Sequence, residues 1–99
     1  MSLRSLWTRE AESGFKEIAD HLEGEWGGLV ADAFVSDVVH TIAMLEVFPN
    51  GGVLEVIDLG IRSIPVARQV RLFYRIDGDR LIILEFIDTR SSRYQLMKE

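Results

Sequence analysis

Arginine and tyrosine side chains gather near the end of this sequence, where they could bind an anion or an acidic protein surface. The run TRSSRY, residues 89–94, places two guanidinium groups and a phenol close together. Guanidinium groups bind phosphates and carboxylates through paired hydrogen bonds. A polar tail that frays after a last strand has a similar composition. The residues alone leave these two interpretations open.

No other set of residues in the sequence predicts a catalytic or metal site. His21 and His40 are not spaced as metal ligands, and the chain has no cysteine, so a zinc site is not expected. The run GEWGG, residues 24–28, lacks the lysine and the preceding strand of a phosphate-binding loop. The carboxylates of Asp77 and Asp79 fit a turn better than a catalytic pair. We therefore expect neither a metal nor a cofactor.

The most apolar part of the chain carries four arginines. The side of the sheet to which they point determines whether they lie beneath the helices or on an open surface. Residues 70–90, VRLFYRIDGDRLIILEFIDTR, predict a hairpin with strands over Val70–Ile76 and Leu81–Ile87. A two-residue turn at residues 77–78 would mix the arginines of the first strand with the apolar side chains of the second. A three-residue loop, with Gly78 in the left-handed conformation, separates them. We favour this loop, because arginines packed beneath helices would be costly.

The favoured register gives the hairpin one apolar face and one mixed face. The face toward the helices would hold Val70, Leu72, Tyr74, Ile82, Leu84 and Phe86. The opposite face would hold Arg71, Phe73, Arg75, Leu81, Ile83, Glu85 and Ile87, with Glu85 near Arg71 as a cross-strand neighbour. Arginines mixed with apolar side chains are typical of a protein-binding surface. A C-terminal segment or a second copy of the chain could also cover this face.

The first half of the chain predicts a short strand and two helices. A strand over residues 3–6 precedes Thr8, whose hydroxyl can cap a helix. Apolar residues at helical spacing continue to Trp26, but Gly24 predicts that this helix ends nearby. A second helix, residues 29–48, has an apolar surface wide enough to contact both the first helix and a sheet. Its side chains expected to point outward are Asp32, Ser36, His40 and Met44.

These elements predict one α+β domain over residues 1–99. A further strand over Ile61–Val66, in which Pro65 indicates an edge or a strand end, completes the order β-α-α-β-β-β. The expected architecture is a helical hairpin packed on an antiparallel sheet. No apolar run reaches the roughly 18 residues of a membrane span, and the N-terminus does not resemble a signal peptide. We therefore expect a cytoplasmic protein that does not bind membranes.

Charge is divided unevenly along the chain. Residues 1–58 hold three basic and eleven acidic side chains, a net charge of −8, whereas residues 59–99 hold eight basic and five acidic, a net charge of +3. Together they give the net charge of −5. This division suggests two surfaces of opposite sign with different partners.

Several runs, taken in their order and spacing, are similar to one known family. They are LWT at 6–8, IADHL at 18–22, FP at 48–49, GIRSIPV at 60–66 and LFYRIDGDRLIIL at 72–84. They resemble the ParE/RelE toxin superfamily of type II toxin–antitoxin systems, whose members are also described as plasmid-stabilisation proteins. The resemblance extends over about Leu6–Arg93 and implies the RelE/ParE-like fold, which has the same β-α-α-β-β-β order.

The resemblance also implies partners and contact residues. A toxin of this kind is neutralised by a ParD-like antitoxin, and the partner-binding residues would be Arg62, Arg71, Phe73, Arg75 and Arg90. An acidic antitoxin segment lying over Arg71, Phe73 and Arg75 would match both their charge and their apolar surface. A homodimer and a toxin–antitoxin hetero-oligomer are both compatible with the sequence.

Two activities are known in the superfamily, and charge favours one. ParE-like members inhibit DNA gyrase by binding it, whereas RelE-like members cut messenger RNA in the ribosome. This chain has only two lysines and a net charge of −5, and ribosome docking depends on contacts with phosphates. We therefore favour the ParE-like branch. The alternative is a RelE-like ribosome-dependent endoribonuclease in which Arg75, Arg90 and Tyr94 are catalytic, so enzymatic activity is left open.

Overall fold

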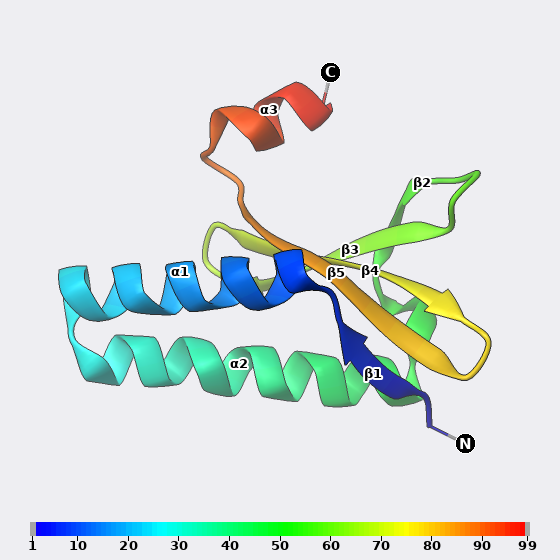
Figure 1. Cartoon of the computed structure of the whole chain (residues 1–99), viewed down its shortest axis with the longest axis horizontal. Helices are drawn as coiled ribbons and strands as arrows, with labels where there is room; N and C mark the ends of the chain where they lie inside the picture. The colour runs from blue at the N-terminus through cyan, green and yellow to red at the C-terminus, as the bar shows by residue number, and fades with distance from the viewer. Residues whose placement is uncertain (1, 99) are drawn as a thin grey trace.

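The helical hairpin comes early in the chain and most of the sheet follows it. A computed structural model describes residues 2–98 (Figure 1). The elements are β1 (Arg4–Trp7), α1 (Arg9–Trp26), α2 (Gly28–Val47), the short 3-10 helix η1 (Pro49–Gly51), β2 (Val53–Val56), β3 (Ile61–Ala67), β4 (Val70–Asp77), β5 (Arg80–Asp88) and α3 (Ser92–Lys98). The predicted α+β fold is confirmed. The sequence did not predict β2 or α3.

The five strands form one mixed sheet in the order β1-β5-β4-β3-β2. β1 runs parallel to β5, and the remaining neighbours are antiparallel, so the sheet is antiparallel except at this edge. β2 pairs only with residues 61–63 of β3, so Pro65 has no partner residue on β2. The proline therefore pairs with Arg71 of β4 on one side and has no partner strand on the other, so β3 is locally an edge strand at this position.

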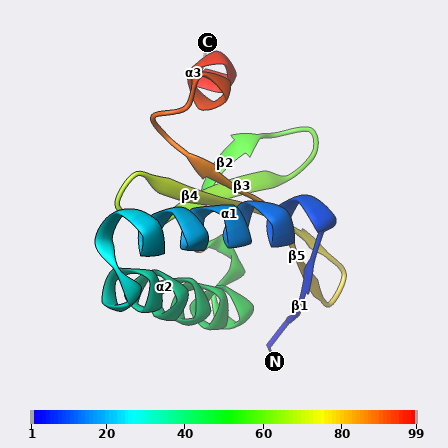
Figure 2. The same cartoon turned by 60° about the vertical axis from the view of Figure 1, so that its left-hand side comes forward.

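The two long helices lie side by side on one face of the sheet, and α3 stands apart from them (Figure 2). α1 does not end near Gly24 as predicted but continues to Trp26. One glycine inside a helix costs only about 1 kcal/mol. The break comes at Gly27, whose φ of +91° is open to glycine and strained for other residues.

The start of α1 is fixed to a bulge in β5. The side chain of Thr8 accepts a hydrogen bond from the N–H of Ala11, as predicted for a cap, and donates one to the carbonyl of Leu84 at 2.6 Å. The ladder pairs Phe73 with Glu85 and Tyr74 with Ile83, so Leu84 is an extra residue on β5. Its carbonyl is therefore available to Thr8, and this bond joins the first helix to the last strand.

The predicted hairpin register is wrong for the first half of β5. Asp77 pairs with Arg80 around a two-residue turn at Gly78 and Asp79, rather than around a three-residue loop. As a result Leu81 and Ile83 are fully buried in the core, and Ile82 and Leu84 are not core residues. The extra residue at Leu84 shifts the alternation of inward and outward side chains by one position. Beyond it the side chains of β5 point as predicted, and Phe86 lies in the core. The predicted β4 face of Val70, Leu72 and Tyr74 is confirmed.

Packing covers less of α2 than its apolar sequence suggested. Its buried residues are Ala31, Phe34, Val38, Ile42 and Leu45. Val39, Val47 and Phe48 are more than half exposed, and the predicted outward residues Asp32, Ser36, His40 and Met44 are all exposed. By length and composition alone α2 could cross a membrane. Its buried side chains are instead part of the core between the helices and the sheet.

Candidate functional site: a groove between the helices and the β3–β4 turn

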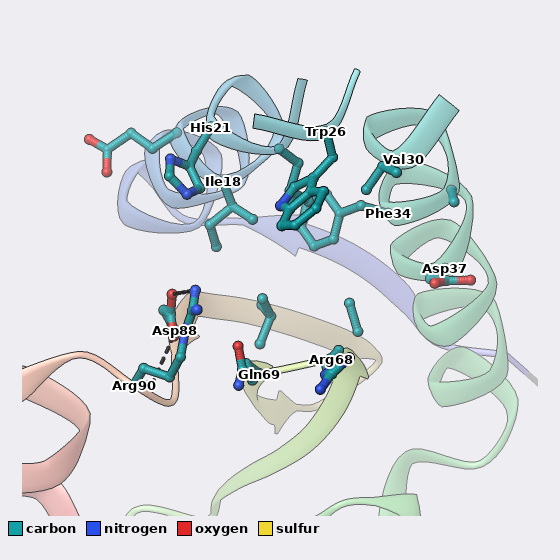
Figure 3. A pocket seen from close by; sticks show the side chains of 15 residues that line it. Ile18, His21, Trp26, Val30, Phe34, Asp37, Arg68, Gln69, Asp88 and Arg90 are labelled. Atoms are coloured by element: carbon teal, nitrogen blue, oxygen red, sulfur yellow. Dashed lines mark hydrogen bonds and ion pairs between the residues drawn. The ribbon is translucent and has the colours of Figure 1, made fainter. Parts of the chain in front are cut away.

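A groove of about 930 Å³ opens beside the helical hairpin (Figure 3). One wall comes from α1 and α2, where the apolar side chains of Ile18, Leu22, Trp26, Val30 and Phe34 lie together with those of Glu17, His21 and Asp37. The opposite wall is polar, formed by Arg68, Gln69, Asp88 and Arg90. Trp26 is 69% exposed although it is a large aromatic side chain. An exposed apolar wall facing two guanidinium groups can bind an amphipathic segment of a protein.

The polar wall is held in place by the turn between β3 and β4. Arg68 and Gln69 form this two-residue turn, since Ala67 pairs with Val70. Gln69 has a φ of +65°, the left-handed conformation that few non-glycine residues adopt. Its carbonyl accepts a hydrogen bond from the N–H of Thr89 at 2.8 Å. This bond fixes the turn next to the end of β5, so that Arg68 and Arg90 lie along the same wall.

Arg90 and Asp88 form a bidentate ion pair on this wall. The Arg90 Nε and Nη2 atoms donate to the two carboxylate oxygens of Asp88 at 3.2 and 3.0 Å, and the Arg90 backbone N–H donates to Oδ1 at 2.8 Å. Hydrogen bonding from Arg90 lowers the pKa of Asp88, and the carboxylate in turn raises the pKa of Arg90. Arg68, by contrast, has no hydrogen bond or ion pair to any residue within 2–98. Of the two arginines that line the groove, Arg68 is therefore the one that can pair with a partner without giving up a contact.

Arg71, Phe73 and Arg75 lie on the sheet face away from the helices, as predicted. Phe73 is only 4% exposed, however, so it is not an open contact. The Arg71 Nε atom donates to the Ser63 hydroxyl at 3.0 Å, and Arg75 lies 3.9 Å from the Asp77 carboxylate. Both guanidinium groups already have partners within the chain.

Glu85 pairs with a different arginine from the one predicted. It lies opposite Phe73 in the ladder, and Arg71 lies opposite Ile87. The Glu85 carboxylate instead accepts a hydrogen bond from Arg93 of α3. The last helix is therefore tied to the arginine-bearing face of the sheet.

Arg62 lies apart from the other predicted contact residues. It pairs with Tyr74 across the ladder, which places it on the face toward the helices. Its Nη1 atom donates to the carbonyl of Gly52 at 2.9 Å. The five predicted partner residues therefore fall on three surfaces: Arg62 on the helix face, Arg71, Phe73 and Arg75 on the opposite face, and Arg90 on the groove.

The residues of the nuclease alternative are also spread out. Arg75 lies opposite Ile82, six residues before the end of β5 at Asp88, whereas Arg90 comes after that end. At about 3.4 Å per residue, this separates the two arginines by roughly 20 Å along the strand. Tyr94 lies in α3. Within residues 2–98, no group of three histidines, aspartates or glutamates is placed to hold a metal ion.

Sequence reasoning missed the groove because its walls come from four separate segments. Trp26 and Val30 were predicted as parts of apolar helix surfaces, without any indication that they would stay exposed. Arg68 stood between two predicted strands and was given no role. One sequence signal for the polar wall was available: the short connection at Arg68 and Gln69. Such a connection predicts a tight turn, which places both residues together at the end of two neighbouring strands.

Comparison with known proteins agrees with this fold. A protein-family model described as the ParE toxin of the type II toxin–antitoxin system parDE matches residues 6–94. A solved structure titled "Chromosomal ParDE TA system from P. aeruginosa" contains a chain that is 25% identical, with a TM-score of 0.73, covering 88% of this chain and 96% of the other. No curated protein matches the sequence. Since the family model spans nearly the whole sequence, this chain belongs to the ParE toxin family of type II toxin–antitoxin systems.

Proposed function

We propose that this protein is a cytoplasmic toxin that inhibits DNA gyrase by binding it and is neutralised by a cognate ParD-like antitoxin. Membership of the ParE toxin family supports the toxin role. The arrangement of the arginines favours protein binding over the nuclease alternative, because Arg75 and Arg90 lie far apart and each has an acidic partner within the chain.

The observation that supports an antitoxin partner most directly is the groove. Its helix wall leaves Trp26 and Val30 exposed, and its other wall carries Arg68 and Arg90. An amphipathic antitoxin helix could pack its apolar residues on the first wall and pair acidic side chains with the second. Arg71 and Arg75 would form a second contact on the far face of the sheet. Arg62 would act through the fold, because it binds the carbonyl of Gly52.

A single substitution in the groove tests this docking. Val30 lines the groove and is 42% exposed, so Val30→Asp should leave the fold intact while placing a charge against the apolar part of the partner. Val35 is 37% exposed on the same helix but does not line the groove, so Val35→Asp is the matched control. The antitoxin of such a system is expected to be encoded in the reading frame next to that of the toxin. We expect this antitoxin to lose at least about tenfold in affinity for the first variant only, equivalent to about 1.4 kcal/mol. Equal losses in both variants would contradict docking in the groove.

Induced expression distinguishes the two cellular targets. A gyrase inhibitor should trigger a DNA-damage response and leave transcripts intact, and the purified toxin should reduce supercoiling by gyrase. Cleaved messenger RNA and arrested translation within minutes would instead support the ribosomal alternative. Expression without any growth defect would contradict both.

A further inference from the structure

The sheet ends in an open edge at β2. Within residues 2–98, β2 has β3 on one side and no strand on the other. All four of its residues are exposed. An edge strand presents unpaired N–H and C=O groups that can pair with another extended chain. The geometry of this edge therefore suits an extended polypeptide segment rather than a helix.

Apolar side chains surround the open edge. Val53, Leu54, Val56, Ile57 and Leu59 are between 40% and 78% exposed. Edge strands are usually protected by lysine, proline or a covering element, and residues 53–59 contain neither of these residue types. The protecting features of β2 are its length of four residues and a bulge at the charged residue Glu55, between the pairs Leu54–Arg62 and Val56–Ile61. An exposed apolar edge of this kind marks an interaction site.

The β2–β3 hairpin also projects from the body of the molecule (Figures 1 and 2). The accessible surface of the chain is 6556 Å², compared with about 5,700 Å² for a compact monomer of this mass. The projecting hairpin contributes to this additional surface. The unpaired edge and both faces of β2 are therefore accessible to a second chain.

The charge of the β2–β3 hairpin indicates which kind of partner could bind its edge. Glu55 and Asp58 are the charged residues between positions 53 and 60, so the edge is acidic. In an antiparallel pair of two copies, Glu55 would face the same acidic segment, and like charges opposite each other are destabilising. A basic segment would face complementary charges. This argues against a second copy and in favour of a basic partner.

We propose that β2 is a docking edge for another protein, which adds an extended segment of alternating apolar and basic side chains to the sheet as a sixth strand. The apolar side chains of that segment would pack on Val53, Val56 and Ile57, and its basic ones would pair with Glu55 and Asp58. This site is separate from the groove and does not depend on the target or the antitoxin proposed above.

The test uses a synthetic eight-residue peptide of alternating arginine and valine, capped at both ends. Binding is followed on the full chain by NMR amide shifts and by hydrogen exchange. We expect the peptide to protect the amides of residues 53–56 at sub-millimolar concentration. Two control peptides should not do so: one alternates glutamate and valine, and one is N-methylated at alternate residues so that it cannot form a strand ladder. No protection up to a few millimolar, or equal binding of a control peptide, would overturn the proposal.

Charge reversal provides the second measurement. The double variant Glu55→Arg, Asp58→Arg should bind the arginine–valine peptide at least about threefold more weakly, because a cross-strand attraction at Glu55 and the attraction of Asp58 in the adjacent turn both become repulsions. The matched control Glu23→Arg, Glu25→Arg makes the same charge change near the end of α1, and its affinity should stay unchanged. Equal weakening in both variants would indicate nonspecific attraction to an acidic protein. Self-association detected by sedimentation, together with protection of the amides of residues 53–56 that rises with protein concentration in the absence of peptide, would assign the edge to a second copy instead.

Discussion

The hydroxyl of Tyr74 accepts a hydrogen bond from the N–H of Gly52 at 2.9 Å and donates one to the carbonyl of Pro49 at 2.7 Å. The two bonds join the middle of β4 to the segment that leads from α2 into β2. Arg62 binds the carbonyl of Gly52 from the neighbouring strand. The exposed β2 hairpin is therefore held at its base by a buried polar network, while its outer end is open.

Tyr74→Phe should destabilise the fold by about 1–3 kcal/mol, because the N–H of Gly52 and the carbonyl of Pro49 would each lose a buried partner. Burial raises the pKa of Tyr74 in the folded state. The unfolded chain therefore releases this proton first, and stability falls as the pH rises above about 10. Chemical denaturation at pH 7 and pH 10.5 should show a smaller alkaline loss for the phenylalanine variant than for the wild type. An equal loss in both would contradict this role of the hydroxyl.

Gly52→Ala should be strongly destabilising. A Cβ atom at this position would lie 2.7 Å from the Tyr74 hydroxyl and 2.8 Å from the carbonyl oxygen of Ser63, closer than such atoms approach. Relief requires a shift of β2 or of the buried ring, at a typical cost of about 1–3 kcal/mol. Gly24→Ala is the control, because nothing lies within 4 Å of its added methyl group. Within a helix that change should stabilise by up to about 1 kcal/mol, so thermal denaturation should move the two variants in opposite directions.

Asp88→Asn should remove an acid-sensitive contribution to stability. Hydrogen bonding from Arg90 lowers the pKa of Asp88 in the folded state, so the carboxylate stabilises the fold above the pKa of the unfolded chain, near 4. That contribution is lost as the pH falls through the lower, folded value. The difference in unfolding free energy between wild type and variant should shrink as the pH is reduced from 6 to 2. In an Arg90→Ala background the same substitution should show a weaker pH dependence, because only the backbone N–H of residue 90 still donates to the Asp88 carboxylate.

Local patterns predicted the main helices and strands but not β2 or α3. They also failed in β5, where one extra residue changes which side chains point toward the helices. The cap at Thr8 and the helix over residues 28–47 follow from short-range chemistry. The register of β5 depends on the two-residue turn at Gly78 and Asp79 and on the bulge at Leu84, whose carbonyl accepts a hydrogen bond from the Thr8 hydroxyl. That contact spans 76 positions in the chain, so no local pattern indicates it. The helix over residues 9–26 was similarly cut short in the prediction, since Gly24 resembles a helix end.

The candidate site was less predictable than the fold. The sequence placed Arg71, Phe73 and Arg75 on one face, and the structure agrees, but burial of Phe73 depends on how neighbouring strands and side chains cover it. Arg62 was named as a contact residue with the family resemblance, and the sequence did not indicate which face of the sheet it occupies. The groove could not be predicted, because the distance between the α1–α2 connection and the β3–β4 turn is set by tertiary packing.

The charge of Arg68 should set the rate at which the antitoxin binds the groove. Its guanidinium group has no partner among residues 2–98, and Arg68 lines the groove as an exposed residue, where charges act mainly by steering association. Arg68→Glu should therefore lower the association rate constant several-fold and reduce its dependence on salt, with a smaller change in dissociation. Arg80→Glu makes the same charge change at the distant β4–β5 turn, so it controls for the net charge of the protein. Stopped-flow binding to the product of the adjacent reading frame, between 50 and 500 mM salt, measures both. If the two variants slow association equally, long-range attraction by the whole chain, rather than the groove, is responsible.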